Sequence, residues 1–368
     1  MTSALPPGPA VAAKPRLLWV DTARGIGIIL VVYAHVLRGQ VSAKLLAPTA
    51  IEQLQDHAIY AFHMPFFFLL SGLFAGSAAR SPLRFLQRRF VSIVYPYLLW
   101  SVAQTFLSIA ANQYANTPGT IHALAQIAVH PIGQFWFLYV LAILQLLLLL
   151  PRPIFYLLVP VSVLAGLEWG TASMLTRAGW SLPFFAAGVF LGPHRLEAWF
   201  HSTREALFWF VGAALLFVLL FAASFPPTLL GGVLRHYFLA TAGSVAALSL
   251  ARLIGDKIRI LPVLGVASLA IFVLHVICGA AIRTLLVKLG LHQPMVATLL
   301  VTLAGLLIPL AVYLLSIRPG LTPWLGLGFP PALPARLPPS IGQSDTPLEP
   351  TGGKADVGPD QARGPEFP

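Results

Sequence analysis

The stretch Leu141-Ala-Ile-Leu-Gln-Leu-Leu-Leu-Leu-Leu150 contains one polar residue among ten. A strand of a membrane β-barrel alternates apolar and polar residues, because one face meets lipid and the other meets the lumen. This stretch does not alternate. It therefore predicts a helix whose backbone amides bond within the segment, as the interior of a bilayer requires.

Similar apolar stretches recur along the chain of 368 residues, which is 57% hydrophobic and 10% charged. Soluble domains carry about 25% charged residues. We therefore expect an all-α fold, a polytopic membrane helix bundle of about ten transmembrane helices, most of them near the roughly 17–25 residues that a bilayer needs. The predicted spans are 17–37, 58–76, 92–111, 135–150, 153–169, 181–193, 206–223, 235–252, 262–282 and 295–316. The span 181–193 is short and contains proline and glycine, which fits a tilted or re-entrant segment.

The formal charge of +11 at pH 7 comes from basic residues in short segments between the spans. An excess of Lys and Arg marks the cytoplasmic loops of membrane proteins. With the N-terminus in the cytoplasm, thirteen basic residues fall in inside segments and six in outside segments. We therefore expect both termini to be cytoplasmic, the lipid bilayer to be a partner, and no nucleic-acid partner.

Composition also divides the chain. Residues 1–16 form a predicted N-terminal cytoplasmic segment, and 17–316 form the transmembrane domain. Residues 317–368 are rich in Pro and Gly and have too little apolar surface to fold, so they predict a disordered cytoplasmic tail that is dispensable for chemistry. The lone Cys278 excludes an intramolecular disulfide. We expect no metal ion.

The first span contains Asp21, Arg24 and His35, although ionisable side chains inside a membrane are costly and therefore usually functional. Arg24 and His35 are 11 residues apart. On a helix, this spacing places them on one face and roughly 16 Å apart along the axis. Asp21 precedes Arg24 by one turn and can pair with it.

Two further histidines reach the depth of His35 under this topology. His63 lies near the outer end of the second span, and His275 lies in the outer half of the ninth. Trp136 and Tyr139 begin the fourth span at the same level. The sequence thus predicts a histidine-lined outer pocket. The simpler interpretations are interfacial histidines and aromatic anchors at the membrane surface.

Arg84, Arg88 and Arg89 precede the third span on the predicted cytoplasmic side, at the level of Arg24. Guanidinium groups suit phosphates because of their forked, permanent charge. These residues predict a basic inner mouth, although they also fit a plain topology signal. The agreement in depth among the three histidines is what favours a functional site over these simpler interpretations.

Several stretches resemble a known family. Trp19-Val-Asp-Thr-Ala-Arg-Gly-Ile-Gly-Ile-Ile-Leu-Val-Val-Tyr-Ala-His35 resembles the first helix of the acyltransferase-3 family of membrane acyltransferases, whose hallmark is an arginine, ten residues and a histidine. A second similarity is to the second-helix motif of the family, over Phe62-His-Met-Pro-Phe-Phe-Phe-Leu-Leu-Ser-Gly72. The residues of this stretch are most similar to those of the fucose 4-O-acetylase-like branch. Weaker similarities are Arg88-Arg-Phe90 with Pro96-Tyr97, Phe135-Trp-Phe-Leu-Tyr139 and Ser268-Leu-Ala-Ile-Phe-Val-Leu-His275. The resemblance covers residues 17–316.

The resemblance implies a membrane O-acyltransferase with a cytoplasmic acyl-CoA donor, usually acetyl-CoA, and a cell-envelope or exported carbohydrate acceptor. The expected location is the bacterial cytoplasmic (inner) membrane. His35 is then the catalytic residue and Arg24 its partner. His35 could act as general base or become acylated, and the sequence leaves both open. We also expect His63 to take part in catalysis. Arg24, Arg88 and Arg89 are expected to bind the acyl-CoA donor, and Trp136, Tyr139 and His275 are expected to bind the acceptor substrate.

Two other classes compete with this interpretation. A transporter or flippase for a glycan, a glycolipid or a proton-coupled solute would use the same buried arginine and histidines as a relay, but no inverted repeat is visible. A polyprenol-dependent glycosyltransferase would require acidic residues, and the predicted outer loops contain few.

The charge asymmetry predicts a testable topology. A reporter fused after Arg318 should report the cytoplasm, and one inserted in the 112–134 loop should report the outside, because the basic residues favour the inner segments. Alkaline phosphatase and fluorescent-protein fusions measure this directly. The opposite pattern at either position would contradict the assignment of the inside and outside segments.

Overall fold

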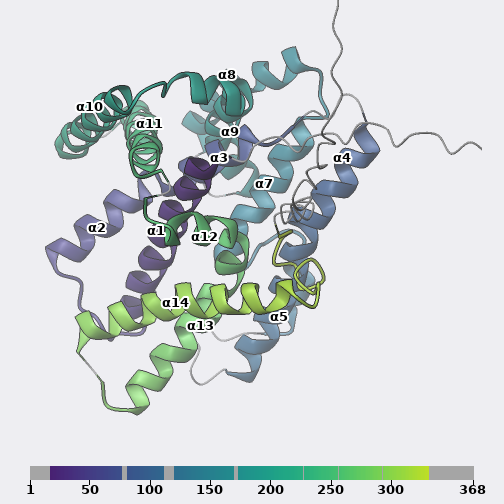
Figure 1. Cartoon of the computed structure of the whole chain (residues 1–368), viewed down its shortest axis with the longest axis vertical. Helices are drawn as coiled ribbons and strands as arrows, with labels where there is room; N and C mark the ends of the chain where they lie inside the picture. The colour runs from purple at the N-terminus through teal and green to yellow at the C-terminus, as the bar shows by residue number, and fades with distance from the viewer. Residues whose placement is uncertain are drawn as a thin grey trace, which may run out of the picture. The chain divides into compact units, whose positions relative to one another are not determined.

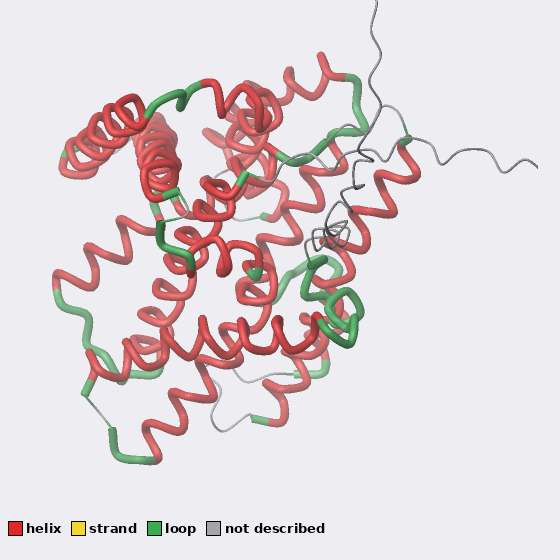
Figure 2. The backbone as a smooth tube through the Cα atoms, in the orientation of Figure 1, coloured by secondary structure: helices red, strands yellow, loops and turns green. Residues whose placement is uncertain are grey.

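Figure 1 shows the computed structural model of the chain, which describes residues 17–76, 81–111, 120–169, 173–226, 228–255, 257–291 and 293–330. Figure 2 shows helices and loops and no strand among these residues, so the described part is all-helical, as the sequence predicts. The predicted N-terminal segment 1–16 lies outside the described residues, as do residues 331–368 of the predicted tail.

The described helices are named here in chain order. They are α1 (Leu18–Ser42), α2 (Ala50–Tyr60), α3 (His63–Leu73), α4 (Pro82–Arg89), the π-helix η1 (Phe90–Val94), α5 (Tyr95–Ala110), α6 (His122–Gln126), the 3-10 turn η2 (Gly133–Phe135), α7 (Trp136–Leu147), α8 (Arg152–Trp169), α9 (Met174–Ala198), α10 (Thr203–Ala222), α11 (Leu229–Ile254), α12 (Ile260–Val266), α13 (Ser268–Lys288) and α14 (Pro294–Ile317).

Seven of the described helices are long and apolar enough to cross a membrane. They are α1, the continuous helix Pro82–Ala110, α9, α10, Leu230–Ile254 within α11, α13 and α14. Gly133–Leu147 and Arg152–Ala165 are apolar but shorter. The polytopic character is confirmed, whereas the predicted number of ten spans is not confirmed.

The predicted span 58–76 is wrong as a single helix. The chain breaks after Tyr60, where α2 ends, and α3 begins at His63. Pro65 favours the break, because a proline inside a helix lacks an N–H and crowds the carbonyl four residues earlier, here that of Ala61. The break places Pro65 in the first turn of α3, where a missing N–H is tolerated.

The predicted short segment 181–193 is likewise corrected. It lies inside α9, a helix of 25 residues whose ends reach beyond the apolar core to Arg177 and Arg195. A hydropathy reading detects only the apolar centre of such a helix. The chain bends at Gly192, whose φ of 56° suits a residue without a side chain.

Helix α1 lies in the interior of the bundle. Its apolar window is 67% buried, whereas that of α10 is 11% buried. The helices packed against α1 include α11, α12, α13 and α14 (Figure 1). The helix that carries the unusual ionisable residues is therefore covered by other helices rather than by lipid.

Glycines allow the closest crossings in the bundle. A Cβ added at Gly25 of α1 would overlap the carbonyl oxygen of Leu261 in α12, and one at Gly265 would overlap that of Asp21. Gly72 of α3 and Gly188 of α9 approach each other in the same way. Small residues at such crossings let helix backbones pack closely, as is common in membrane bundles.

The packed part of the chain extends past the predicted boundary at residue 317. Thr322 and Leu327 are buried, and the indole N–H of Trp100 in α5 donates to the carbonyl oxygen of Leu325 at 2.9 Å. The chain after α14 is therefore held against α5, which donates to carbonyls of the turn Thr322–Gly326.

The crossing of α3 and α9 supplies a stability prediction. Gly188→Ala should lower stability by about 1–3 kcal/mol, because its Cβ would meet the backbone oxygen of Leu69, which cannot move aside cheaply. Gly212→Ala in α10 is the matched control, since open space surrounds that position. Thermal unfolding in detergent measures both. An equal melting temperature for the two variants would contradict the tight crossing.

Candidate active site

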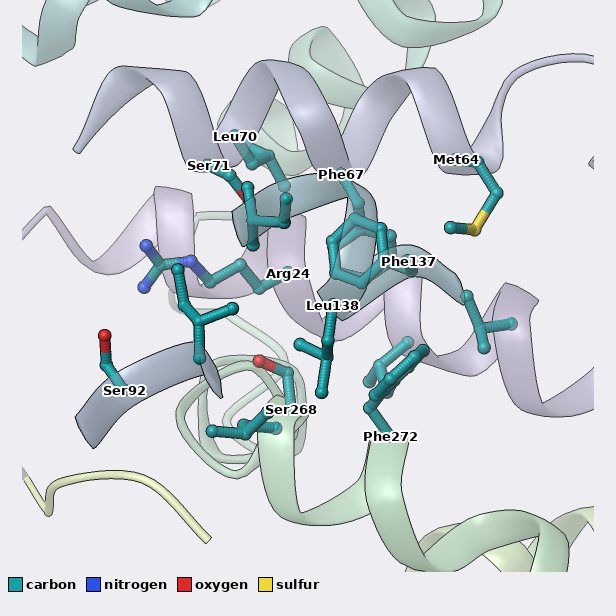
Figure 3. Close-up of a pocket in the computed structure, with 15 residues that line it drawn as sticks. Arg24, Met64, Phe67, Leu70, Ser71, Ser92, Phe137, Leu138, Ser268 and Phe272 are labelled. Carbon is teal, nitrogen blue, oxygen red and sulfur yellow. The ribbon is translucent and has the colours of Figure 1, made fainter. Parts of the chain in front are cut away.

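A cavity of about 140 Å³ lies among α1, α3, η1, α7 and α13 (Figure 3). Its walls are mainly apolar, and its polar side chains are one arginine and three serines. The lining residues are Arg24, Ile28, Val31, Met64, Phe67, Leu70, Ser71, Ser92, Ile93, Phe137, Leu138, Leu141, Ser268, Leu269 and Phe272. A mainly apolar chamber with a few polar groups and one charged residue suits a ligand that has an apolar part and an anionic end.

Arg24 marks one end of this cavity. Figure 3 shows its guanidinium pointing away from Met64, which lies at the other end. The guanidinium lies 3.3 Å from the carboxylate of Asp21 and 4.9 Å from the centroid of the Phe74 ring. The predicted pairing of Arg24 with Asp21 is therefore confirmed. Asp21 is only 3% exposed, so the pair compensates a buried charge.

The cavity follows a single face of α1. Arg24, Ile28 and Val31 line it, and His35 continues the same face one turn further along the helix. On α13, Phe272 lines the cavity and His275 follows one turn later. The cavity thus extends from Arg24 to the turn before the two histidines.

The three predicted histidines come together beyond that end. The rings of His35 and His275 are 5.2 Å apart between centroids. The ring of Tyr60 lies 4.6 Å from that of His63 and 6.5 Å from that of His35. Three helices thus bring imidazoles to one region, with Tyr60 between two of them. Among the described residues, no group of three or more His, Cys, Asp or Glu side chains is placed to hold a metal ion.

Backbone carbonyls fix the tautomers of two of these histidines. His63 Nδ1 donates to the carbonyl of Ile59 at 2.8 Å, and His275 Nδ1 donates to that of Phe272 at 2.8 Å. A carbonyl only accepts, so each neutral ring carries its proton on Nδ1 and a lone pair on Nε2. Both Nε2 atoms are buried without a partner among the described residues. They are acceptors for a hydroxyl or for an imidazole N–H.

The predicted inner arginines divide into two kinds. Arg89 is half-buried, donates to the carbonyl of Ala75 and lies 4.9 Å over the Phe85 ring. Arg84 and Arg88 are exposed. Arg89 therefore fastens the segment after α3 to α4, whereas Arg84 and Arg88 remain accessible to an anion.

Neither predicted aromatic residue of α7 lines the cavity. Trp136 packs against Phe68 and lies under the guanidinium of Arg177, 5.3 Å from it. Tyr139 donates from its hydroxyl to the carbonyl of Ala128 at 3.0 Å. The cavity instead meets Phe137, between these two positions, and the ring of Phe137 lies 5.5 Å from that of Phe272 on α13.

The comparison with known proteins agrees with this architecture. The family described as an acyltransferase domain, Acyl_transf_3, matches residues 17–314. The chain belongs to the acyltransferase-3 family. It is also similar to the nodulation protein NolL of Sinorhizobium fredii, with 30% identity over 136 residues, which are 35% of this chain and 35% of NolL. The match thus spans about a third of that relative's length. No solved structure matches the chain.

Within this acyltransferase-3 chain, sequence reasoning missed Tyr60 and the three cavity serines. Ser71 and Ser268 stand inside stretches that carry the family resemblance, and Tyr60 precedes His63 by three residues. Their place in or beside the motifs was the available signal. Ser92 lies in η1, and such π-helical turns are frequent at functional sites.

The division of the arginines predicts unequal effects of substitution. Arg89→Ala should lower the stability of this acyltransferase by about 1–3 kcal/mol, because it removes a charged donor from the carbonyl of Ala75. Arg88→Ala, one residue away and exposed, should leave the melting temperature unchanged. Thermal unfolding of the two purified variants checks this, and equal shifts would refute a structural role confined to Arg89.

Proposed function

We propose that this protein is a membrane O-acetyltransferase that moves an acetyl group from cytoplasmic acetyl-CoA to a hydroxyl of a cell-envelope or exported carbohydrate. The observation that carries the proposal is the cavity along one face of α1, which starts at Arg24 and stops one turn before His35. Membership of the acyltransferase-3 family supports the class of reaction. We further propose that the donor is acetyl-CoA, that the acceptor is a carbohydrate and that the protein lies in the bacterial inner membrane.

The thioester arm of the proposed donor would occupy the cavity, with its phosphates at the Arg24 end. Coenzyme A has phosphates at one end and a thin arm that ends in the thioester. Arg24, with the exposed Arg88 near the cytoplasmic pole, would bind the phosphates. The serine hydroxyls offer hydrogen bonds to the amides of the arm, and the apolar walls cover its methylenes. The thioester then points along α1 toward His35.

The histidine region would carry the chemistry. As general base, His35 takes the proton of the acceptor hydroxyl while the hydroxyl oxygen attacks the thioester carbonyl, and the thiolate of coenzyme A leaves. As nucleophile, His35 first forms an acetyl-imidazole, which the hydroxyl then attacks. The Nε2 lone pairs of His63 and His275 are acceptors that would orient the N–H of His35 in either route.

A transporter or flippase is the second candidate, because imidazoles and a partly buried arginine in membrane helices also suit a relay. The cavity favours the transferase. Its charged side chain lies at one end only, and its other polar groups are three serine hydroxyls. Transfer by purified protein distinguishes the two classes, since a transporter consumes no acetyl-CoA.

The decisive variants change His35 and Arg24 in the full chain. His35→Gln keeps polarity but loses the proton acceptor, so transfer should fall by at least about a hundredfold while acetyl-CoA still binds. Arg24→Lys keeps the charge but loses the fork, so it should weaken acetyl-CoA binding. His57→Gln is the matched control, because His57 is exposed on α2.

The readouts are acetyl transfer at equal protein levels, acetyl-CoA binding, and mass spectrometry of envelope glycans with and without the protein. Transfer by His35→Gln at the wild-type rate would remove His35 from the chemistry. If the wild-type protein neither consumes acetyl-CoA nor changes the acetylation of any glycan, the acetyltransferase proposal is contradicted and the transporter becomes the favoured function.

A further inference from the structure

Two polar contacts hold α2 against the end of α1 that carries His35. The hydroxyl of Tyr33 donates to the side-chain oxygen of Gln55 at 2.7 Å. The guanidinium of Arg38 donates from Nε and Nη2 to the two carboxylate oxygens of Asp56 at 2.7 and 2.9 Å. The second contact is a parallel, two-bond pair, which fixes the orientation as well as the position of the guanidinium.

The same guanidinium covers an aromatic ring. Its central carbon lies 3.1 Å from the centroid of Tyr60, so Arg38 bonds a carboxylate with its edge and faces the ring with its plane. A planar guanidinium makes both contacts at once, which a lysine ammonium cannot do. Asp56 therefore determines where Arg38 lies, and Arg38 determines where the Tyr60 ring lies.

Tyr60 transmits this placement to the histidines. Its ring packs edge-on against His63, at 4.6 Å, and lies 6.5 Å from His35. The neighbouring carbonyl of Ile59 accepts the hydrogen bond from His63 Nδ1. The last turn of α2 thus fixes His63 through a ring contact and a backbone bond, and covers His35 as well.

The Arg38–Asp56 pair is partly open to water, because the Arg38 side chain is 50% exposed and that of Asp56 is 21% exposed. Water screens its contribution to folding, although the two-bond geometry is the favourable one for such a pair. Tyr33 and Gln55 already join the two helices. Unlike that link, the pair also contacts the Tyr60 ring, which lies beside the histidines.

We propose that Arg38, held by Asp56, is a positioning residue that fixes Tyr60 against His35 and His63, so that the acceptor hydroxyl meets His35 in one geometry. This inference rests on the acetyltransferase function proposed above. Arg38 does not line the cavity and acts through Tyr60, so it affects the transfer step rather than donor binding.

The kinetic test compares variants of the full chain. Arg38→Met, which keeps the stem and loses the fork, should lower kcat about tenfold or more and change the KM for acetyl-CoA less than about twofold. Tyr60→Leu should match it, whereas Tyr60→Phe keeps the ring and should retain most activity. The double variant Arg38→Met, Tyr60→Leu should lower kcat little further than either single variant, because both substitutions remove the same contact between Arg38 and Tyr60. Tyr33→Phe, which breaks the other link, is the control.

A second measurement does not depend on activity. In protein with isotope-labelled histidine, the ring signals of His35 and His63 should shift in Arg38→Met and stay in place in Tyr33→Phe. Unchanged signals, or a wild-type kcat for Arg38→Met, would overturn the positioning role. If the wild-type protein transfers no acetyl group, the acetyltransferase proposal fails, and the histidine signals still decide whether Arg38 positions these rings.

Discussion

The structure depends on the need to keep the ionisable face of α1 away from lipid. Asp21, Arg24 and His35 lie on a helix that is long and apolar enough to span a membrane. Charged groups exposed to hydrocarbon are expensive, so they face the interior of a bundle or a polar cavity. Helices α11 to α14 pack around α1, and glycines at its crossing with α12 let the two backbones approach.

The second determinant is the helix break before His63. The chain turns after Tyr60, three residues before the Pro65 turn of α3, and α3 packs as a short buried helix against α9. Pro65 favours this break, because it lacks the N–H that would continue the helix ladder. The break sets the end of one helix, with Tyr60 and Ile59, beside the start of the next. The carbonyl of Ile59, in the last turn of α2, accepts the hydrogen bond from the His63 ring at the start of α3, so the two helices are joined at the site.

The site combines a charged end and an imidazole end on one helix. Asp21 holds Arg24, backbone carbonyls hold His63 and His275, and the pair of Asp56 and Arg38 holds Tyr60. Arg24, Tyr60, His63 and His275 are thus each oriented by a neighbouring side chain or backbone carbonyl. Such support is what gives a reactive side chain one geometry instead of several.

The sequence by itself determined the membrane-helix class, the family resemblance, and the shared face of Arg24 and His35. These features are local, because hydropathy and the helical repeat depend only on neighbours along the chain. The order and direction of the predicted spans also predicted one region for the three histidines, and the structure brings their rings together there. Tertiary structure alone decided three features. They are the face of α7 that meets the cavity, the contact of Arg89 with the segment after α3 while Arg88 stays exposed, and the place of Tyr60 beside two histidines under Arg38. The reason is physical: each depends on how separate helices rotate and cross, and those angles follow from packing between side chains of different segments.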